Sequence, residues 1–132
     1  MALPVYTSLV TLLIAVYYLW VGLHVGMVRG KVKIPAPAMS GEPLLERAIR
    51  VQMNAVEFAP VILPGLWLAA LWMSDVWAAA FGLVWVVARV AYMRLYMANP
   101  SSRGPAFGAQ FLAAVILVGM AFAGVVLKLL NG

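Results

Sequence analysis

Four long apolar stretches restrict the possible folds of this chain more than any other feature. They run from Pro4 to Val28, Pro43 to Met73, Val76 to Met97 and Pro105 to Leu130. A helix needs about 20 mostly apolar residues to cross a bilayer, so each stretch can form one membrane span. We therefore predict an all-α fold: a single integral membrane domain over residues 1–132, built as a four-helix bundle with antiparallel up-down topology.

Composition excludes a soluble domain. Hydrophobic residues make up 66% of the chain and charged residues 10%, and a soluble fold of this length could not bury so much apolar surface. No cation precedes Arg29, so the first stretch does not resemble a cleaved signal and we expect it to be retained. With no cysteine and one histidine, we expect no metal centre. The expected surroundings are membrane lipid, with no nucleic-acid partner.

The cations are unevenly distributed among the connections. Arg29, Lys31, Lys33, Arg47 and Arg50 surround the first, and Arg94 and Arg103 flank the third. The second connection contains only Ser74 and Asp75 between its helices. Because Lys and Arg accumulate on the cytoplasmic side of membrane proteins, we predict a multi-pass protein with both termini on the non-cytoplasmic side.

Two polar stripes interrupt the apolar stretches. Arg47, Arg50, Asn54 and Glu57 fall on one face of the second helix, and Trp85, Arg89, Tyr92 and Tyr96 on one face of the third. Counting from the turn between these helices places Glu57 and Arg89 at similar depth inside the membrane. Ionisable groups inside a membrane are costly unless they are paired, so we expect these two to pair.

Facing stripes would form a pocket open to the cytoplasm. Its cations would be Arg29, Arg50, Arg89 and Arg103. Glu57 would accept an ammonium group, and the arginines would bind carboxylates in forked geometry, which suits a small soluble ligand with more acids than amines. A cation such as Arg103 near a bound thiol lowers the thiol pKa from its ordinary value of about 8.5 and favours the nucleophilic thiolate.

Structural explanations exist for each element taken alone. The basic loop around Arg29 can serve topology only, and Tyr92 and Tyr96 can form an aromatic belt at the membrane interface. An ion pair between Glu57 and Arg89 can be purely structural. The stripes together are harder to explain in this way, because packing requires one pair and not several cations accompanied by phenols.

The stripes resemble a known family. The residues that carry the resemblance are Arg50, Gln52, Asn54, Glu57 and Pro60, followed by Arg89, Tyr92, Tyr96 and Arg103. Their order and spacing are similar to those of the membrane-associated proteins in eicosanoid and glutathione metabolism, the MAPEG family, which includes microsomal glutathione transferases and leukotriene synthases. The similarity extends from Arg29 through the fourth helix.

The resemblance implies a homotrimer that binds glutathione between neighbouring subunits near the cytoplasmic face. The tripeptide would be held by the residues at Arg50, Gln52, Asn54, Glu57, Arg89, Tyr92 and Tyr96. Arg103 would stabilise the thiolate, and Arg29 matches a further basic position close to the sulfur. Phe58 departs from the pattern, since eicosanoid-type members have a tyrosine there, so one hydrogen bond to glutathione is lost or supplied by another group.

The leading hypothesis is a glutathione transferase or glutathione peroxidase that acts on a lipophilic electrophile or lipid hydroperoxide. An alternative is a non-catalytic membrane scaffold or regulatory protein of the same fold. A third is a proton-coupled exporter with Glu57 as proton carrier, but no ionisable residue continues the stripe to the other side of the membrane.

Overall fold

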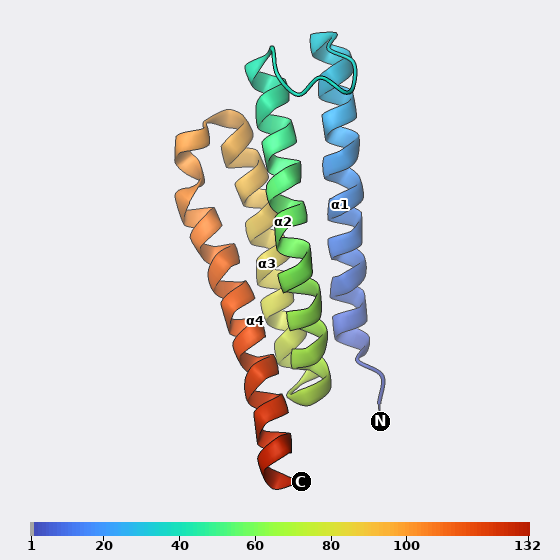
Figure 1. Cartoon of the computed structure of the whole chain (residues 1–132), viewed down its shortest axis with the longest axis vertical. Helices are drawn as coiled ribbons and strands as arrows, with labels where there is room; N and C mark the ends of the chain where they lie inside the picture. Colours follow the sequence, from blue (N-terminus) through green and yellow to red (C-terminus); the bar gives the residue numbers. More distant parts are fainter. Residues whose placement is uncertain (1) are drawn as a thin grey trace.

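The computed structural model of the protein describes residues 2–132 and contains four long helices and one short 3-10 helix in that range (Figure 1). The elements are α1 (Val5–Val32), α2 (Pro43–Trp72), α3 (Asp75–Ala98), η1 (Pro100–Arg103) and α4 (Gly104–Asn131). Four helices are long and apolar enough to cross a membrane, which fits an integral multi-pass membrane protein. The start of α1 and the end of α4 lie at one end of the bundle and the α1–α2 loop at the other (Figure 1).

The helix ends follow local sequence signals. Pro43 occupies the first turn of α2, where its missing N–H costs nothing. The hydroxyl of Ser74 accepts the N–H of Trp77 at 3.3 Å and caps α3. Helix α1 continues one turn beyond the expected end at Val28, because its last turn carries Arg29 and Lys31, and cations there interact favourably with the helix dipole.

The middle of the bundle is formed by α2 and α3. Helices α1 and α4 each pack against both of them, on opposite sides (Figure 1). Glycines permit close approach at two contacts. A Cβ at Gly82 would lie 2.9 Å from side-chain atoms of Leu66 and Val10, and one at Gly124 would lie 2.7 Å from the Cβ of Trp72. Small residues at such positions are typical of helix packing in membranes.

The turn between α2 and α3 also holds the start of α1. The carboxylate of Asp75 accepts the backbone N–H of Thr7 at 2.8 Å and that of Tyr6 at 3.1 Å. These are first-turn amides, which have no partner inside their own helix. Pro4, the residue before α1, provides no side-chain cap. Asp75 therefore caps a helix that lies 68 residues earlier in the chain.

Candidate functional site

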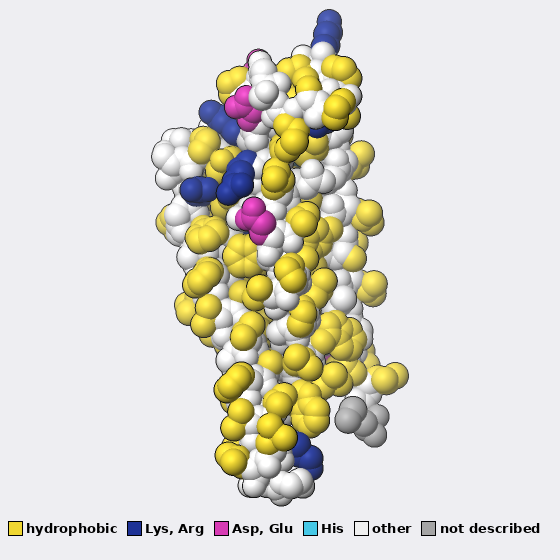
Figure 2. All heavy atoms as spheres, viewed as in Figure 1, with side chains coloured by type: hydrophobic (Ala, Val, Ile, Leu, Met, Phe, Trp, Pro, Cys, Tyr) yellow, Lys and Arg dark blue, Asp and Glu magenta, His cyan; other side chains and the backbone are white. Residues whose placement is uncertain are grey.

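Charged side chains gather toward the end of the bundle that carries the α1–α2 loop, and the rest of the visible face is largely apolar (Figure 2). Two of these charges belong to α2. Arg50 and Glu57 are seven residues apart and therefore lie on the same face, two turns from each other. Their side chains form an ion pair, with the Arg50 Nη1 3.8 Å from the Glu57 Oε1, and are 49% and 55% exposed. This pair is accessible from outside the bundle.

Arg89 lies in the opposite environment. It is fully buried, at 0% exposure, and its guanidinium donates to all three neighbouring helices. Nε donates to the Tyr17 hydroxyl at 3.2 Å, Nη1 to Asn54 Oδ1 at 2.6 Å and to Gln110 Oε1 at 3.0 Å, and Nη2 to the Val51 carbonyl at 3.0 Å. A buried arginine thus connects α1, α2, α3 and α4.

The predicted pair between Glu57 and Arg89 is wrong. Glu57 pairs with Arg50 instead, and among residues 2–132 no carboxylate forms an ion pair with Arg89. The reason is the helical rotation of α2, since three residues on a helix are offset by about 60° from a full turn. Asn54 is directed into the bundle and is 8% exposed. Glu57 is thereby turned outward, and the amide of Asn54 lies between the two charges.

Stacked rings lead from Arg89 to the surface. The guanidinium carbon of Arg89 lies 4.5 Å from the ring centroid of Tyr92. Tyr92 stacks on Tyr96, with centroids 5.6 Å apart and planes inclined by 25°. The guanidinium of Arg103 in turn lies 5.5 Å from the centroid of Tyr96. Two cations therefore enclose two phenol rings, and Arg103 is the exposed end of the stack.

Two predicted site residues lie apart from this group in the single chain. Gln52 is directed toward α1, with its amide nitrogen 3.6 Å from the position that a Cβ of Gly22 would take. Arg29, in the last turn of α1, donates to the Ala38 carbonyl at 2.5 Å and so contacts the α1–α2 loop. The nine predicted residues thus divide into three sets. The accessible set on α2, α3 and η1 consists of Arg50, Glu57, Tyr96 and Arg103, the buried set of Asn54, Arg89 and Tyr92, and the set beside α1 of Arg29 and Gln52.

Tyr17 and Gln110 were not among the predicted site residues. Both hydrogen-bond to Arg89. The sequence signal for Gln110 is its position as a polar residue within the most apolar of the four helices, and the structure shows it fully buried. A polar side chain there has to find a partner inside the protein. Tyr17 has no such signal, because a tyrosine in an apolar helix is also compatible with simple packing.

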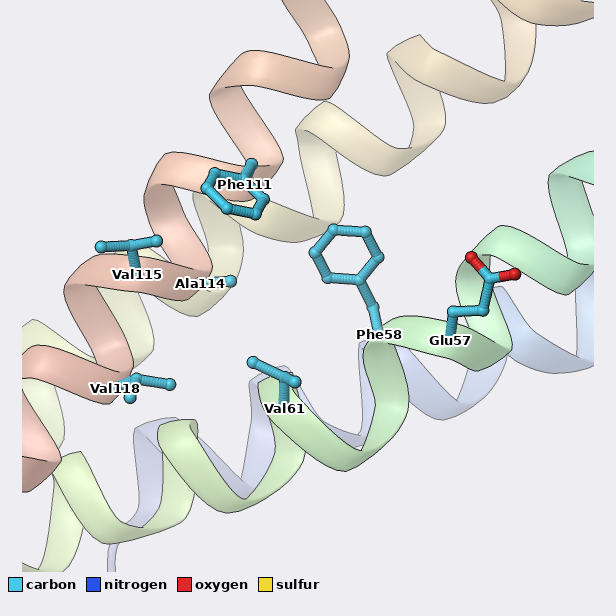
Figure 3. A pocket seen from close by; sticks show the side chains of 7 residues that line it. All are labelled: Glu57, Phe58, Val61, Phe111, Ala114, Val115 and Val118. Atoms are coloured by element: carbon cyan, nitrogen blue, oxygen red, sulfur yellow. The ribbon is translucent and has the colours of Figure 1, made fainter.

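An apolar groove runs between α2 and α4 beside the Arg50–Glu57 pair. It has a volume of about 420 Å³ and is lined by Glu57, Phe58, Val61, Phe111, Ala114, Val115 and Val118. Figure 3 shows Phe58 and Val61 of α2 turned toward the α4 residues, with Glu57 at one end. The Phe58 ring lies 6.2 Å from the rings of Trp85 and Phe107, so it belongs to the aromatic packing beneath the groove.

The functional groups available at this site are guanidinium groups, one carboxylate and phenol rings. Within residues 2–132, no group of three or more His, Cys, Asp or Glu residues is arranged to hold a metal ion. The accessible groups are the Arg50–Glu57 pair, the half-buried Tyr96 and the exposed Arg103. They can bind a ligand that carries both carboxylates and an ammonium group, with an apolar surface next to it.

Comparison with known proteins identifies the family of this chain. The profile of the MAPEG family matches residues 7–123. An uncharacterized protein of Synechocystis is 36% identical over 84% of this chain and 81% of that protein. Human microsomal glutathione S-transferase 2 is 35% identical over 83% of this chain and 76% of the transferase. Mouse leukotriene C4 synthase is 32% identical over 99% of this chain and 85% of the synthase. The chain therefore belongs to the MAPEG family.

Proposed function

We propose that this protein is a membrane-bound glutathione transferase or glutathione peroxidase. In this proposal a bound glutathione thiolate attacks a lipophilic electrophile or a lipid hydroperoxide. The names of the human and mouse relatives, a glutathione S-transferase and a leukotriene C4 synthase, support glutathione-related chemistry in general. The observation that carries the proposal is that Arg50, Glu57, Tyr96 and Arg103 form an accessible group on helices that are otherwise suited to lipid.

Glutathione matches these side chains in charge. It carries two carboxylates, an ammonium group and a thiol. Glu57 is available for the ammonium group, and Arg50, already 3.8 Å from Glu57, is available for a neighbouring carboxylate. Exposed charges on a membrane helix are expensive unless something polar covers them. A doubly acidic tripeptide would cover this pair and neutralise part of its charge.

Arg103 is the proposed catalytic residue. A free thiol has a pKa of about 8.5, and a nearby cation favours the thiolate. The thiolate sulfur would then form a bond to the electrophilic atom of the second substrate. The leaving group would depart with the electrons of its bond. The groove between α2 and α4 would offer an apolar surface to a substrate that arrives from the bilayer.

The proposed assembly is a homotrimer, as the resemblance to the MAPEG family implies, and the two separated sets of predicted residues support a closed ring of subunits. Arg29 and Gln52 lie beside α1 and the first loop, whereas Arg50, Glu57 and Arg103 are accessible on the opposite side of α2. One site in one chain cannot use both sets without rearrangement. In a closed ring of subunits, the α1 side of one chain would face the exposed set of the next. Each glutathione would then be held by residues of two subunits.

We further propose that the helices cross the membrane in up-down order, with both termini on the non-cytoplasmic side and the site facing the cytoplasm. The Lys and Arg residues gathered near the α1–α2 loop support this orientation (Figure 2). Cytoplasmic exposure of the site would also give access to the cell's soluble glutathione. Labelling of single cysteines introduced into this naturally cysteine-free chain tests the orientation directly.

The function is tested by mixing purified protein with glutathione and recording the ultraviolet absorbance of the thiolate. We expect thiolate formation by the wild type, loss of most of it in Arg103→Ala, and a corresponding loss of conjugation of a chlorinated nitrobenzene. Arg94→Ala is the matched control, because Arg94 is exposed on α3 and lines a different groove. Wild-type protein that forms no thiolate, or Arg103→Ala protein that conjugates normally, contradicts the proposal.

A melting experiment separates this function from a non-catalytic scaffold. Ligands that bind only the folded state raise its stability. Millimolar glutathione should therefore raise the melting temperature of the wild type, and should do so less for Glu57→Gln. A scaffold without a glutathione site would show no such shift in either protein.

A further inference from the structure

Arg89 occupies a place in the site that differs from that of the other predicted residues. We propose that Arg89 is a positioning residue, which orients both halves of the glutathione site from inside the bundle and does not touch the tripeptide. This inference rests on the proposed function for the identity of the ligand. The contacts that carry it are present in the single chain and can be tested without glutathione.

Four of the five N–H donors of Arg89 are already engaged. Its guanidinium makes four hydrogen bonds, to Tyr17, Val51, Asn54 and Gln110. The residue is 0% exposed, and the rings of Tyr17, Trp85 and Tyr92 lie around it. A side chain enclosed in this way has little to offer a ligand at the surface. Two of its contacts, with Asn54 and with Tyr92, continue outward to accessible site residues.

The first series of contacts runs along α2. A guanidinium can only donate hydrogen bonds, so the oxygen of the Asn54 amide has to face Arg89. Nη1 of Arg89 donates to this oxygen at 2.6 Å. The amide nitrogen of Asn54 is then directed outward and lies 3.5 Å from Glu57 Oε2. The other oxygen of Glu57 faces Arg50. Arg89 thereby sets the orientation of the carboxylate that would receive the ammonium group.

The second series runs along α3 to the proposed catalytic residue. The Arg89 guanidinium lies over the face of Tyr92, Tyr92 stacks on Tyr96, and Tyr96 carries Arg103 on its ring. Cation–π contacts strengthen when they are shielded from water, as the Arg89 contact is. Because Tyr92 is fully buried, its ring provides a fixed support for the stack. The position of Arg103 therefore depends on Arg89 through two rings.

Lysine is the informative replacement. Arg89→Lys keeps the positive charge, but an ammonium group lacks the planar fork that reaches three helices at once and stacks on a ring. We expect Tyr92 to lose its flat cationic partner and Arg103 to leave the face of Tyr96. Tyr17→Phe is the matched control, because it removes one hydrogen bond to Arg89 on the side facing α1, which leads to no accessible site residue.

The position of Arg103 can be followed without glutathione. The chain has six arginines, so ¹⁵N-arginine labelling gives a sparse NMR spectrum in which the Arg103 side-chain signal is identified by its loss in Arg103→Lys. Stacking on Tyr96 shifts this signal through the ring current. We expect Arg89→Lys to move it to the position of the exposed Arg94, and Tyr17→Phe to leave it in place. An unchanged Arg103 signal in folded Arg89→Lys protein overturns the inference, whatever glutathione does.

A second pair of variants covers the case in which Arg89→Lys does not fold. The Tyr92 hydroxyl makes no hydrogen bond within the described residues. Tyr92→Phe therefore keeps the ring, and Tyr92→Leu removes it. We expect the shifted Arg103 signal to persist in Tyr92→Phe and to be lost in Tyr92→Leu. Equal Arg103 signals in these two proteins also overturn the inference.

Thiol titration then connects positioning to chemistry. We expect Arg89→Lys to raise the pKa of bound glutathione by about one unit, roughly a tenfold change in the ionisation constant. In an Arg103→Ala background, the same substitution should change the pKa no further, because Arg89 acts through Arg103. A merely structural Arg89 would lower the number of sites but not change the pKa of each. If the wild type forms no thiolate, the proposed function fails, and the NMR result still decides the positioning.

Discussion

The contact between Asp75 and the start of α1 gives a prediction whose size can be worked out from the structure. The carboxylate accepts the N–H of Tyr6 at 3.1 Å and that of Thr7 at 2.8 Å. Loss of a helix cap costs about 0.5–2 kcal/mol, and hydrogen bonds to charged groups contribute about 1.5–3 kcal/mol when they are well shielded. Because Asp75 lies near the surface, we take about 1–2 kcal/mol for Asp75→Ala.

The stability lost in Asp75→Ala should be confined to the first turn of α1. An opening free energy lower by one or two kcal/mol makes the open state about 5–30 times more frequent. Amide hydrogen exchange reports these openings segment by segment. We expect the first turn of α1, at Tyr6 and Thr7, to exchange faster by this factor in Asp75→Ala. The middle of α1 should exchange at the wild-type rate. Asp75→Asn, which keeps an acceptor oxygen but loses the charge, should give a smaller effect.

Ser74→Ala provides the control for this experiment. Ser74 caps α3 through the Trp77 N–H, and within residues 2–132 its side chain forms no hydrogen bond to α1. This variant should accelerate exchange at the start of α3 only. The reasoning is refuted if Asp75→Ala leaves the first turn of α1 at the wild-type rate. It is equally refuted if Ser74→Ala accelerates that turn as much, because the effect would then come from α3 itself.

Three further predictions concern packing and binding. Gly124→Ala should cost about 1–3 kcal/mol, because the new Cβ would lie 2.8 Å from the backbone oxygen of Trp72. The control Gly119→Ala, with nothing within 4 Å, should leave the melting temperature unchanged or raise it, because alanine favours a helix over glycine. Arg47→Ala should lower the free energy of unfolding by about 0.5–1.5 kcal/mol, because it removes the 3.1 Å hydrogen bond to the Met97 carbonyl at the end of α3. Urea denaturation in detergent measures this loss, and an unchanged midpoint contradicts the prediction. Arg50→Gln should weaken glutathione binding about tenfold in calorimetry, because it removes a cation that is available for a carboxylate of glutathione. Lys128→Gln, in the last turn of α4, should leave the binding constant unchanged.

The helices were predictable because each apolar stretch carries its own signal. Length and hydropathy identify a span wherever it lies, and residues such as Pro43 and Ser74 mark helix starts locally. The polar stripe of α2 was predictable for the same reason, since helical periodicity places Arg50 and Glu57 on one face. These features depend on residues that are close together in the chain.

The partners across helices could not be predicted in this way. Whether Arg89 contacts Glu57 or Asn54 depends on the rotation of α2 about its axis. Sequence spacing fixes that rotation only to within about 100°, the angle between successive residues of a helix. The acceptor at Gln110 and the cap at Asp75 join residues 21 and 68 positions apart. No local pattern connects such pairs. The resemblance to the MAPEG family predicts Arg89 as a site residue but gives no indication that it lies buried behind the others.

The buried guanidinium of Arg89 also bears on how the protein is made. A lone α3 would carry this charge into lipid at a cost of about 2.5–3.5 kcal/mol on the translocon scale. Three of its four acceptors, Tyr17, Val51 and Asn54, belong to the two helices that are synthesised first. Only Gln110 follows later. Most of the hydrogen-bond acceptors of Arg89 are therefore synthesised before Arg89 itself.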